Sequence, residues 1–268
     1  MKLLLRSSLL VALFALSAAG ALFAQYRFGY NTNPYGAVDN EKAEFGWSRL
    51  RYNMSMSGRY FGFGGYGGWS TDYPKADRTF LRAFQRLTRI NAKSTEQVVD
   101  LDSNDPSGSI YNWPFVYAVQ VQNWTFTPAQ AQKMREYLLK GGFLMVDDFH
   151  GTADWQAFMR GMNMIFPDRP IEEVANNDEL FHVIFDLGER FQVPGEQYVA
   201  TGRTYEKDGF DPHWRAIRDD QGRIMVAICY NMHLGDAWEW ADDPQYPEKF
   251  ASMAFRLGID YIMYSMTH

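Results

Sequence analysis

A group of acidic and imidazole side chains follows a hydrophobic run in the middle of the chain. Asp147, Asp148 and His150 come directly after the apolar residues 143–146. Carboxylates and imidazole at the end of a buried strand can transfer protons or bind a divalent metal ion. Asp148 and His150 are therefore candidate catalytic residues, and Asp147 is a candidate metal ligand.

A metal site needs three or four ligands, so further donors must come from elsewhere. They could come from His182, or from His233 and Asp236, which follow a second hydrophobic run and are candidate metal ligands together with Asp147. This prediction requires the two loops to converge. In the alternative interpretation, Asp147 or Asp148 caps the helix that follows, and His150 donates a hydrogen bond to a backbone carbonyl. The sequence leaves both interpretations open.

Aromatic side chains form the second kind of candidate site. Tryptophan faces can stack on the apolar faces of sugar rings and other flat ligands. Trp238 and Trp240 have acidic neighbours and are expected to be the more exposed of these rings. The predicted ligand-binding residues are Trp69, Asp72, Trp124, Trp238 and Trp240.

Strand and helix signals alternate along most of the chain, which predicts an α/β domain with a doubly wound, mostly parallel sheet. Ligands of such sheets bind beyond the carboxyl ends of the strands, where the candidate residues lie. No element is assigned to residues 167–207. Strands are expected at 45–52, 97–101, 115–121, 143–146 and, as a hairpin, at 214–217 and 223–230. Helices are expected from the Asp72-Tyr73-Pro74 start signal, from the capping box at Thr127, at 155–162 and from Pro247 onward.

The N-terminus has the pattern of a secretory signal peptide. Lys2 and Arg6 precede an apolar stretch, and small residues suited to signal peptidase follow it. We expect cleavage after Ala24, giving a signal peptide (1–24), an extended N-terminal arm (25–44) and one α/β domain (45–268). No cysteine near the cleavage site could accept a lipid, so we expect no membrane anchor after cleavage. The predicted location is periplasmic or extracellular.

Several short segments carry a family resemblance. The run from Gly141 to Asp148 resembles a bacterial family, the domain of unknown function numbered 4159. Trp69, the Asp72-Tyr73-Pro74 segment and the residues 114–117, 181–185 and 222–223 fit the same pattern. That family resembles the class I glutamine amidotransferase-like fold and the trehalose-utilisation-type proteins. The resemblance implies a flavodoxin-like architecture but no reaction.

The sequence also excludes several activities. Amidotransferases of this fold place an activated cysteine on a strand-to-helix turn, where this chain has Asp148. Cys229, the only cysteine, lies inside a predicted strand, and no Gly-x-Ser-x-Gly motif occurs. The net charge of -6 without a dense basic block argues against nucleic acid as a partner.

Two functions remain as hypotheses. The first is an exported protein that binds a small molecule or glycan, with hydrolytic or metal-assisted chemistry as one option. The second is a non-catalytic interaction or scaffold protein of a cell-envelope complex, motivated by the N-terminal arm and by a loop rich in glycine and aromatic residues at 58–69.

Overall fold

The structure of the protein is a computed structural model, which describes residues 42–54, 68–103 and 108–268. The predicted signal peptide and nearly all of the predicted arm lie outside these residues, as does most of the loop at 58–69. Among the described residues, no helix is long and apolar enough to cross a membrane.

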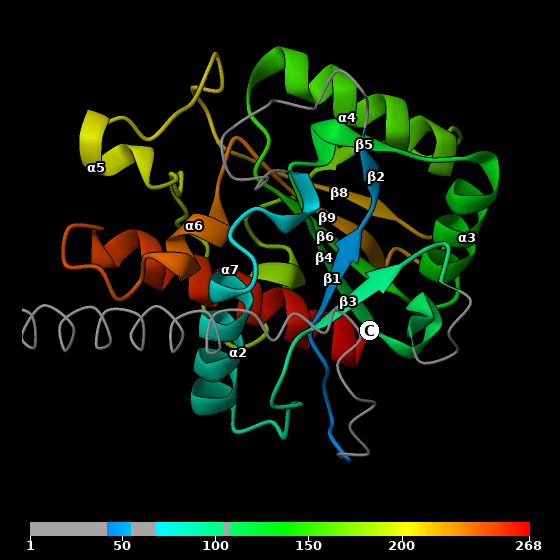
Figure 1. Ribbon diagram of the computed structural model, residues 1–268, viewed down its shortest axis with the longest axis horizontal. Coiled ribbons are helices and arrows are strands. Elements are labelled where there is room, and N and C mark those ends of the chain that lie inside the picture. Colours follow the sequence, from blue (N-terminus) through cyan, green and yellow to red (C-terminus); the bar gives the residue numbers. More distant parts are fainter. Residues whose placement is uncertain (1–41, 55–67, 104–107) are drawn as a thin grey trace, which may run out of the picture. The chain divides into compact units, whose positions relative to one another are not determined.

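A seven-stranded sheet forms the centre of the domain (Figure 1), with the strand order β3-β1-β4-β6-β9-β8-β7. The first five strands in this order are parallel, and at one edge β8 pairs antiparallel with both β9 and β7. The prediction of a mostly parallel α/β sheet is thus confirmed. The strands are β1 (Ser48–Arg51), β3 (Gln97–Asp100), β4 (Phe115–Val119), β6 (Phe143–Asp147), β7 (Glu172–Glu173), β8 (His213–Arg218) and β9 (Ile224–Tyr230). A separate antiparallel pair joins β2 (Asn53–Met54) and β5 (Trp124–Thr125).

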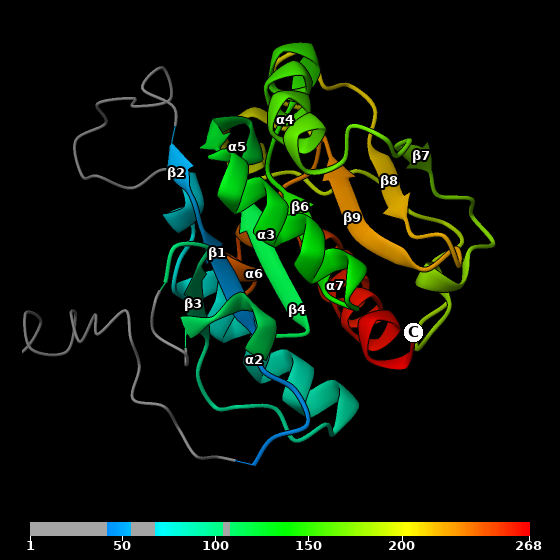
Figure 2. The same ribbon diagram turned by 90° about the vertical axis from the view of Figure 1, so that its right-hand side faces the viewer.

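Helices cover both faces of the sheet (Figure 2). One face packs against α2 (Lys75–Thr88), α6 (Leu234–Glu239) and α7 (Glu248–Thr267), and the other against α3 (Pro128–Leu139) and α4 (Gly151–Ile165). Every residue of β4, β6 and β9 is buried, as expected for strands covered on both sides. Short 3-10 helices occur at η2 (Gly68–Ser70), η4 (Ile110–Asn112), η5 (Val121–Asn123) and η6 (Glu179–Phe181).

The clearest local signals in the sequence are confirmed. The Thr127 hydroxyl accepts a hydrogen bond from the Gln130 amide, and the Gln130 side chain accepts one from the Thr127 amide, which completes the capping box of α3. Gly141, after the helix, has a φ of 107°, a conformation that favours glycine. The hairpin of β8 and β9 also forms where it is predicted.

Two helix starts differ from the prediction. Helix α4 begins at Gly151, four residues earlier than expected, because the carboxylate of Asp208 accepts hydrogen bonds from the amide and hydroxyl of Thr152. This cap comes from a distant segment and leaves no local signal. Helix α2 has no side-chain cap, since Asp72 has a φ of 61° and its carboxylate contacts His233 instead.

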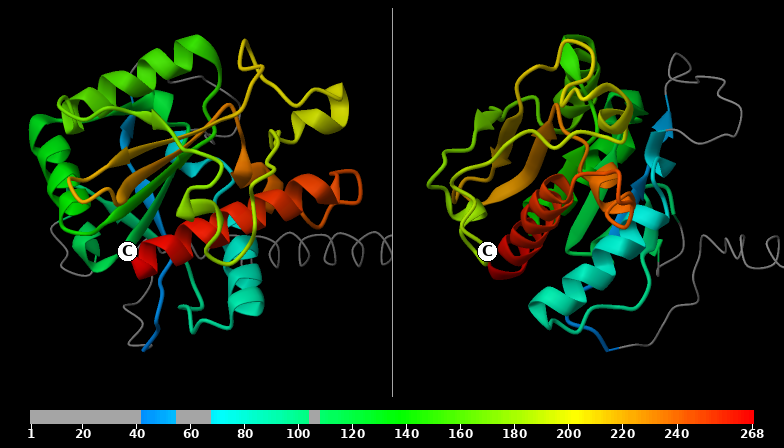
Figure 3. Two further views of the ribbon diagram at one scale, coloured as in Figure 1. Left: turned by 180° about the vertical axis from the view of Figure 1, so that it is seen from behind. Right: turned by 90° about the vertical axis from the view of Figure 1, so that its left-hand side faces the viewer.

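The unassigned region 167–207 contains little regular structure, chiefly β7, η6 and α5 (Gln197–Thr201). The later part of this region lies beside the start of α6 (Figure 3). Val193 accepts a hydrogen bond from the His233 amide at 2.9 Å, and the Gln192 side chain donates to the carbonyl of Asn231. These hydrogen bonds and the burial of Leu180, Phe181 and Val193 in the core hold the segment in place without a regular hydrophobic period.

Candidate functional site

The candidate residues after β6 and β9 meet at one edge of the sheet. These strands are parallel neighbours, so their carboxyl ends lie side by side. The Asp148 amide donates to the carbonyl of Met232 at 3.1 Å, and the Asn231 amide donates to Phe149 at 3.1 Å. The two loops are therefore tied together through their backbones, which is the condition that the predicted metal site sets.

Both loops contain a residue in the left-handed region. Asp148 has a φ of 56° and Asn231 a φ of 64°, which aspartate and asparagine tolerate better than most residues. The side chain of Asn231 accepts a hydrogen bond from Gly151 and donates one to the carbonyl of Asp211. The sharp turn at Asp148 thus directs its side chain into the site from a fixed backbone.

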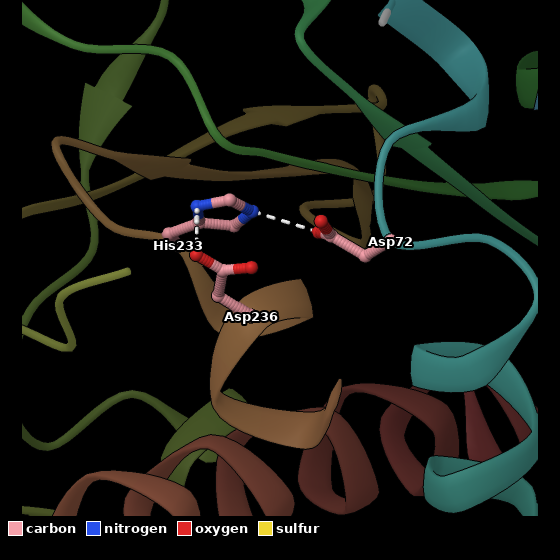
Figure 4. A group of neighbouring side chains, drawn as sticks. All are labelled: Asp72, His233 and Asp236. Atoms are coloured by element: carbon pink, nitrogen blue, oxygen red, sulfur yellow. Dashed lines mark hydrogen bonds and ion pairs between the residues drawn. The ribbon is translucent and has the colours of Figure 1, made fainter. Parts of the chain in front are cut away.

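His233 lies at the centre of a group that we call the aspartate–histidine cluster: Asp72, Asp148, His233 and Asp236. The His233 Nε2 atom lies 2.8 Å from Asp72 Oδ2 and 3.4 Å from Asp148 Oδ2, and Nδ1 lies 3.2 Å from Asp236 Oδ2. Figure 4 shows the imidazole between Asp72 and Asp236, which contact opposite nitrogens. One imidazole thus contacts three carboxylates.

Two glycines allow this close approach. A Cβ atom at Gly235 would lie 2.6 Å from Asp72 Oδ2, and one at Gly195 would lie 2.7 Å from Asp236 Oδ2 and 2.8 Å from His233 Nδ1. Contacts this short do not occur for real Cβ atoms. The space around the cluster therefore depends on glycine in two segments distant in sequence.

Burial and mutual attraction set the protonation of the cluster. Burial opposes the charge of His233, but Asp148, Asp236 and Asp72 together raise its pKa well above the usual value. Burial also opposes the charge of Asp148, but His233 and His150 lower the pKa of that carboxyl to about 2. Burial raises the pKa of Asp236 to about 6, with Asp72 adding to the shift. The three carboxylates thus favour the charged form of the imidazole.

Asp147 was predicted to be a metal ligand, but its carboxylate contacts the start of a helix. Its Oδ2 atom accepts hydrogen bonds from the amides of Leu234 and Gly235, at 2.7 and 3.1 Å, and from the Tyr117 hydroxyl at 2.9 Å. It therefore caps the first turn of α6, whereas the alternative interpretation had it cap the helix directly after it. Burial raises the pKa of Asp147 to about 7.

His150 is buried beside the cluster. Its Nε2 atom lies 3.4 Å from Asp148 Oδ1 and 3.6 Å from Glu206 Oε1, and neither ring nitrogen has a hydrogen-bond partner among the described residues. The expectation that His150 hydrogen-bonds a backbone carbonyl is therefore wrong. Its backbone amide donates instead to Asp154, which also pairs with Lys207.

The tryptophans are placed less favourably for ligand binding. Trp238 is fully buried against Trp47 and Phe80, so the expectation of an exposed ring is wrong. Trp124 is buried and stacks on Phe158. Both rings fill the core because neighbouring aromatic side chains enclose them, which their positions near loops did not reveal.

Trp69 and Trp240 remain partly exposed. Trp69 borders a cavity of about 360 Å³ whose lining includes Asn53 and Gln130 but no residue of the aspartate–histidine cluster. Trp240 carries the Lys75 ammonium 5.1 Å from its ring centroid. These two rings stay candidate ligand-binding residues.

Two acidic residues near the cluster were not predicted as site residues: Glu206 was not noted, and Glu239 was noted only as an acidic neighbour of the tryptophans. Glu206 comes from the region 167–207, where no pattern assigned structure. Glu239, in α6, is half-buried, and burial together with Asp72 and Asp236 raises its pKa to about 7. Its position beside Trp238 and Trp240 drew attention to the segment, but only the packing of α6 brings its carboxyl near the other acids.

The donor set of the cluster suits a divalent cation. Ligand atoms of Asp72, His233 and Asp236 lie within 4.8 Å of one another, and carboxylate and imidazole together bind zinc, manganese and similar ions. The molecule is thus a mixed α/β protein with an acidic, histidine-centred site at the carboxyl edge of a mostly parallel sheet.

Comparison with known families identifies the chain further. The family described as Domain of unknown function (DUF4159) matches residues 48–266, and the chain belongs to that family. A search of curated proteins found no match.

Proposed function

We propose that the chain is an exported domain that binds a divalent cation in the aspartate–histidine cluster and, through this ion, a small molecule or glycan. The observation that carries the proposal is the surroundings of His233. Asp72 and Asp148 flank Nε2, and Asp236 contacts Nδ1. Metal-binding histidines commonly donate their other ring N–H to a carboxylate in this way.

One ion cannot bind both nitrogens of an imidazole, so the ligand atom must be chosen. We assign Nε2, because two carboxylates face it and one faces Nδ1. The first ligands are then His233, Asp72 and Asp148, while Asp236 orients the ring. This assignment retains His233 from the predicted ligands, moves Asp236 to a supporting position and leaves Asp147 as the cap of α6.

A cation would relieve the excess negative charge of the cluster. The single imidazolium faces three carboxylates, and burial weakens the screening of their repulsion by water. A divalent ion in place of the proton adds one positive charge. Such an ion polarises bound oxygen atoms and lowers the pKa of bound water. Glu239, with its raised pKa, is then a candidate to accept a proton.

The fold supports an analogy with glutamine amidotransferase-like proteins. Numbered along the chain, the five parallel strands have the order 2-1-3-4-5, which is that of flavodoxin-like sheets. Asp148, with its positive φ, lies on a sharp strand-to-helix turn where nucleophile-bearing enzymes place serine or cysteine. Cys229 is buried, and burial raises the pKa of its thiol. We therefore propose a related fold without amidotransferase activity.

Calorimetric titration with Zn²⁺ and Mn²⁺ tests cation binding. We expect the purified mature protein to bind, and His233→Gln to weaken the first binding step at least 100-fold. His182→Gln is the matched control, because His182 hydrogen-bonds the carbonyl of Asn176 away from the cluster. Absent binding in the unmodified protein, or equal losses in both variants, would contradict the proposal.

Export is tested separately. Cell fractionation with N-terminal sequencing should find the protein outside the cytoplasm, beginning at Gln25. A cytoplasmic protein that retains residues 1–24 would contradict this part of the proposal and leave cation binding untouched. Once binding of an ion is established, a panel of sugars with and without that ion would identify the ligand class.

A further inference from the structure

A single cation at His233 leaves the buried side chain of His150 without a hydrogen-bond partner in the described part of the chain. Its side chain is 3% exposed, and neither ring nitrogen has a hydrogen-bond partner among the described residues. Buried polar atoms are nearly always hydrogen-bonded, and an unsatisfied one needs an explanation. The nearest carboxylate oxygens, at 3.4 and 3.6 Å from Nε2, are too distant for strong hydrogen bonds.

Those distances fit a different arrangement. Two ligand atoms that are each about 2.1 Å from one ion, at a tetrahedral angle, lie about 3.4 Å apart. The Nε2 atom of His150 has this separation from Asp148 Oδ1 and a slightly longer one from Glu206 Oε1. An ion between these three atoms would have His150 and the two carboxylates as its ligands.

Asp148 makes the surroundings of the two histidines similar. Its Oδ1 atom lies 3.4 Å from His150 Nε2, and its Oδ2 atom lies 3.4 Å from His233 Nε2. Each histidine also faces a second carboxylate, Glu206 in one case and Asp72 in the other. The ring centroids are 6.5 Å apart. One carboxylate therefore lies between two imidazoles, each of which has its own acidic partner.

We propose that Asp148 bridges two divalent cations, the first bound by His233 and Asp72 and the second bound by His150 and Glu206. The inference rests on the proposed function for the first ion and adds the second. Two ions carry four positive charges, which match the four carboxylates of Asp72, Asp148, Glu206 and Asp236 when both imidazoles are neutral. The pair would bind oxygen atoms of one ligand from two sides, as two-metal sites do.

Metal analysis and electron paramagnetic resonance of the Mn²⁺-loaded mature protein test this proposal. We expect two ions per chain and the spectrum of a spin-coupled pair. His150→Gln should bind one ion and give the spectrum of isolated Mn²⁺. Asp148→Asn should weaken both sites, whereas His213→Gln, outside the cluster, should keep two coupled ions.

Glu206→Gln gives an independent readout, because this partly exposed side chain can change without disturbing the core. It should lower the affinity of the second ion at least tenfold and leave the first unchanged. Circular dichroism verifies that each variant is folded. A single ion per chain that persists in His150→Gln and Glu206→Gln would overturn the second site and leave the first intact. Absence of any bound ion would overturn both.

Discussion

Among the described residues, two groups of buried charges are satisfied to very different extents. Arg49, on β1, donates to both carboxylate oxygens of Asp77 in α2, and its Nη1 donates to the carbonyls of Trp69 and Thr71. Trp47 donates to the same carboxylate. In the aspartate–histidine cluster and beside it, Asp148 Oδ2 and both nitrogens of His150 have no hydrogen-bond partner among the described residues.

The difference separates a structural ion pair from a candidate binding site. Burial opposes the charge of Arg49, but Asp77 more than offsets this effect and keeps the pKa of the guanidinium above its usual value. The pair needs nothing further. The cluster combines an excess of carboxylates with unpartnered atoms, so a cation would satisfy it. Substitutions should therefore affect the two groups in opposite directions.

The largest effect should come from the ion pair. Asp77→Asn leaves the Arg49 charge buried without its partner, and we expect the free energy of unfolding to fall by about 3–5 kcal/mol. Urea denaturation measures this change. Asp168→Asn, which removes an exposed partner of Arg135, is the control and should leave the unfolding midpoint nearly unchanged. Similar midpoints for both variants would remove the distinction.

The cluster should make stability depend on pH when no metal is present. The pKa values of His233 and Asp236 in the cluster, and of Asp147 beside it, are raised in the folded protein, so the folded state retains protons that the unfolded chain releases. Stability from these groups is lost as pH rises through their folded values. Asp148, whose pKa is lowered to about 2, adds no slope above pH 5.

We expect the free energy of unfolding of the metal-free protein to fall by about 2 kcal/mol between pH 5 and pH 8. Urea denaturation in a chelator at each pH measures the slope. Addition of the bound cation should reduce it, because the ion replaces the proton on His233. If the free energy of unfolding of the metal-free protein did not change with pH, the charges of the cluster would not destabilise the fold.

A single amide substitution in the cluster should stabilise the metal-free protein. Asp236→Asn keeps the oxygen that accepts from the Glu196 amide and removes one buried negative charge. We expect a gain of about 1–2 kcal/mol at pH 8 together with a 10–100-fold loss of cation affinity. Thermal unfolding in a chelator and calorimetric titration measure the two effects. A loss of stability in metal-free protein would place Asp236 with the structural pair.

The smallest effect is expected at Asp260 in α7, an intermediate case. Its Oδ1 atom accepts from the amides of Ile184 and Phe185, while Oδ2 has no hydrogen-bond partner among the described residues. Burial raises the pKa of Asp260 to about 6. Its stabilising contribution is therefore lost as pH rises from about 4 to 6. Asp260→Asn should gain about 1 kcal/mol at pH 8 and flatten this window, with cation binding unchanged.

The fold was largely predictable because its signals are local. The alternation of strands and helices, the capping box at Thr127 and the β8–β9 hairpin need only neighbouring residues to form. The convergence of the loops after β6 and β9 was only a condition of the predicted metal site, and the parallel pairing of the two strands in the structure meets it. The start of α4 was missed, since its cap comes from Asp208.

The site was predictable in part. Asp148, His150, His233 and Asp236 were identified because they follow buried strands or lie close behind one. Trp238 was expected to be exposed, but helix packing turned it into the core. The burial of a ring near a loop depends on which helix covers it, and no periodicity in a short helix reveals that.

The sequence by itself determined which chemistry is available: two groups of acids and histidines, a single cysteine in a strand, and no serine motif. Only the tertiary structure decided which of these side chains meet. In the folded protein, Asp72 contacts His233 instead of capping the helix that follows it. Asp147 accepts hydrogen bonds from the first turn of α6, and Glu206 lies 3.6 Å from His150. Such choices depend on contacts between segments up to 161 residues apart, and those contacts leave no pattern along the chain.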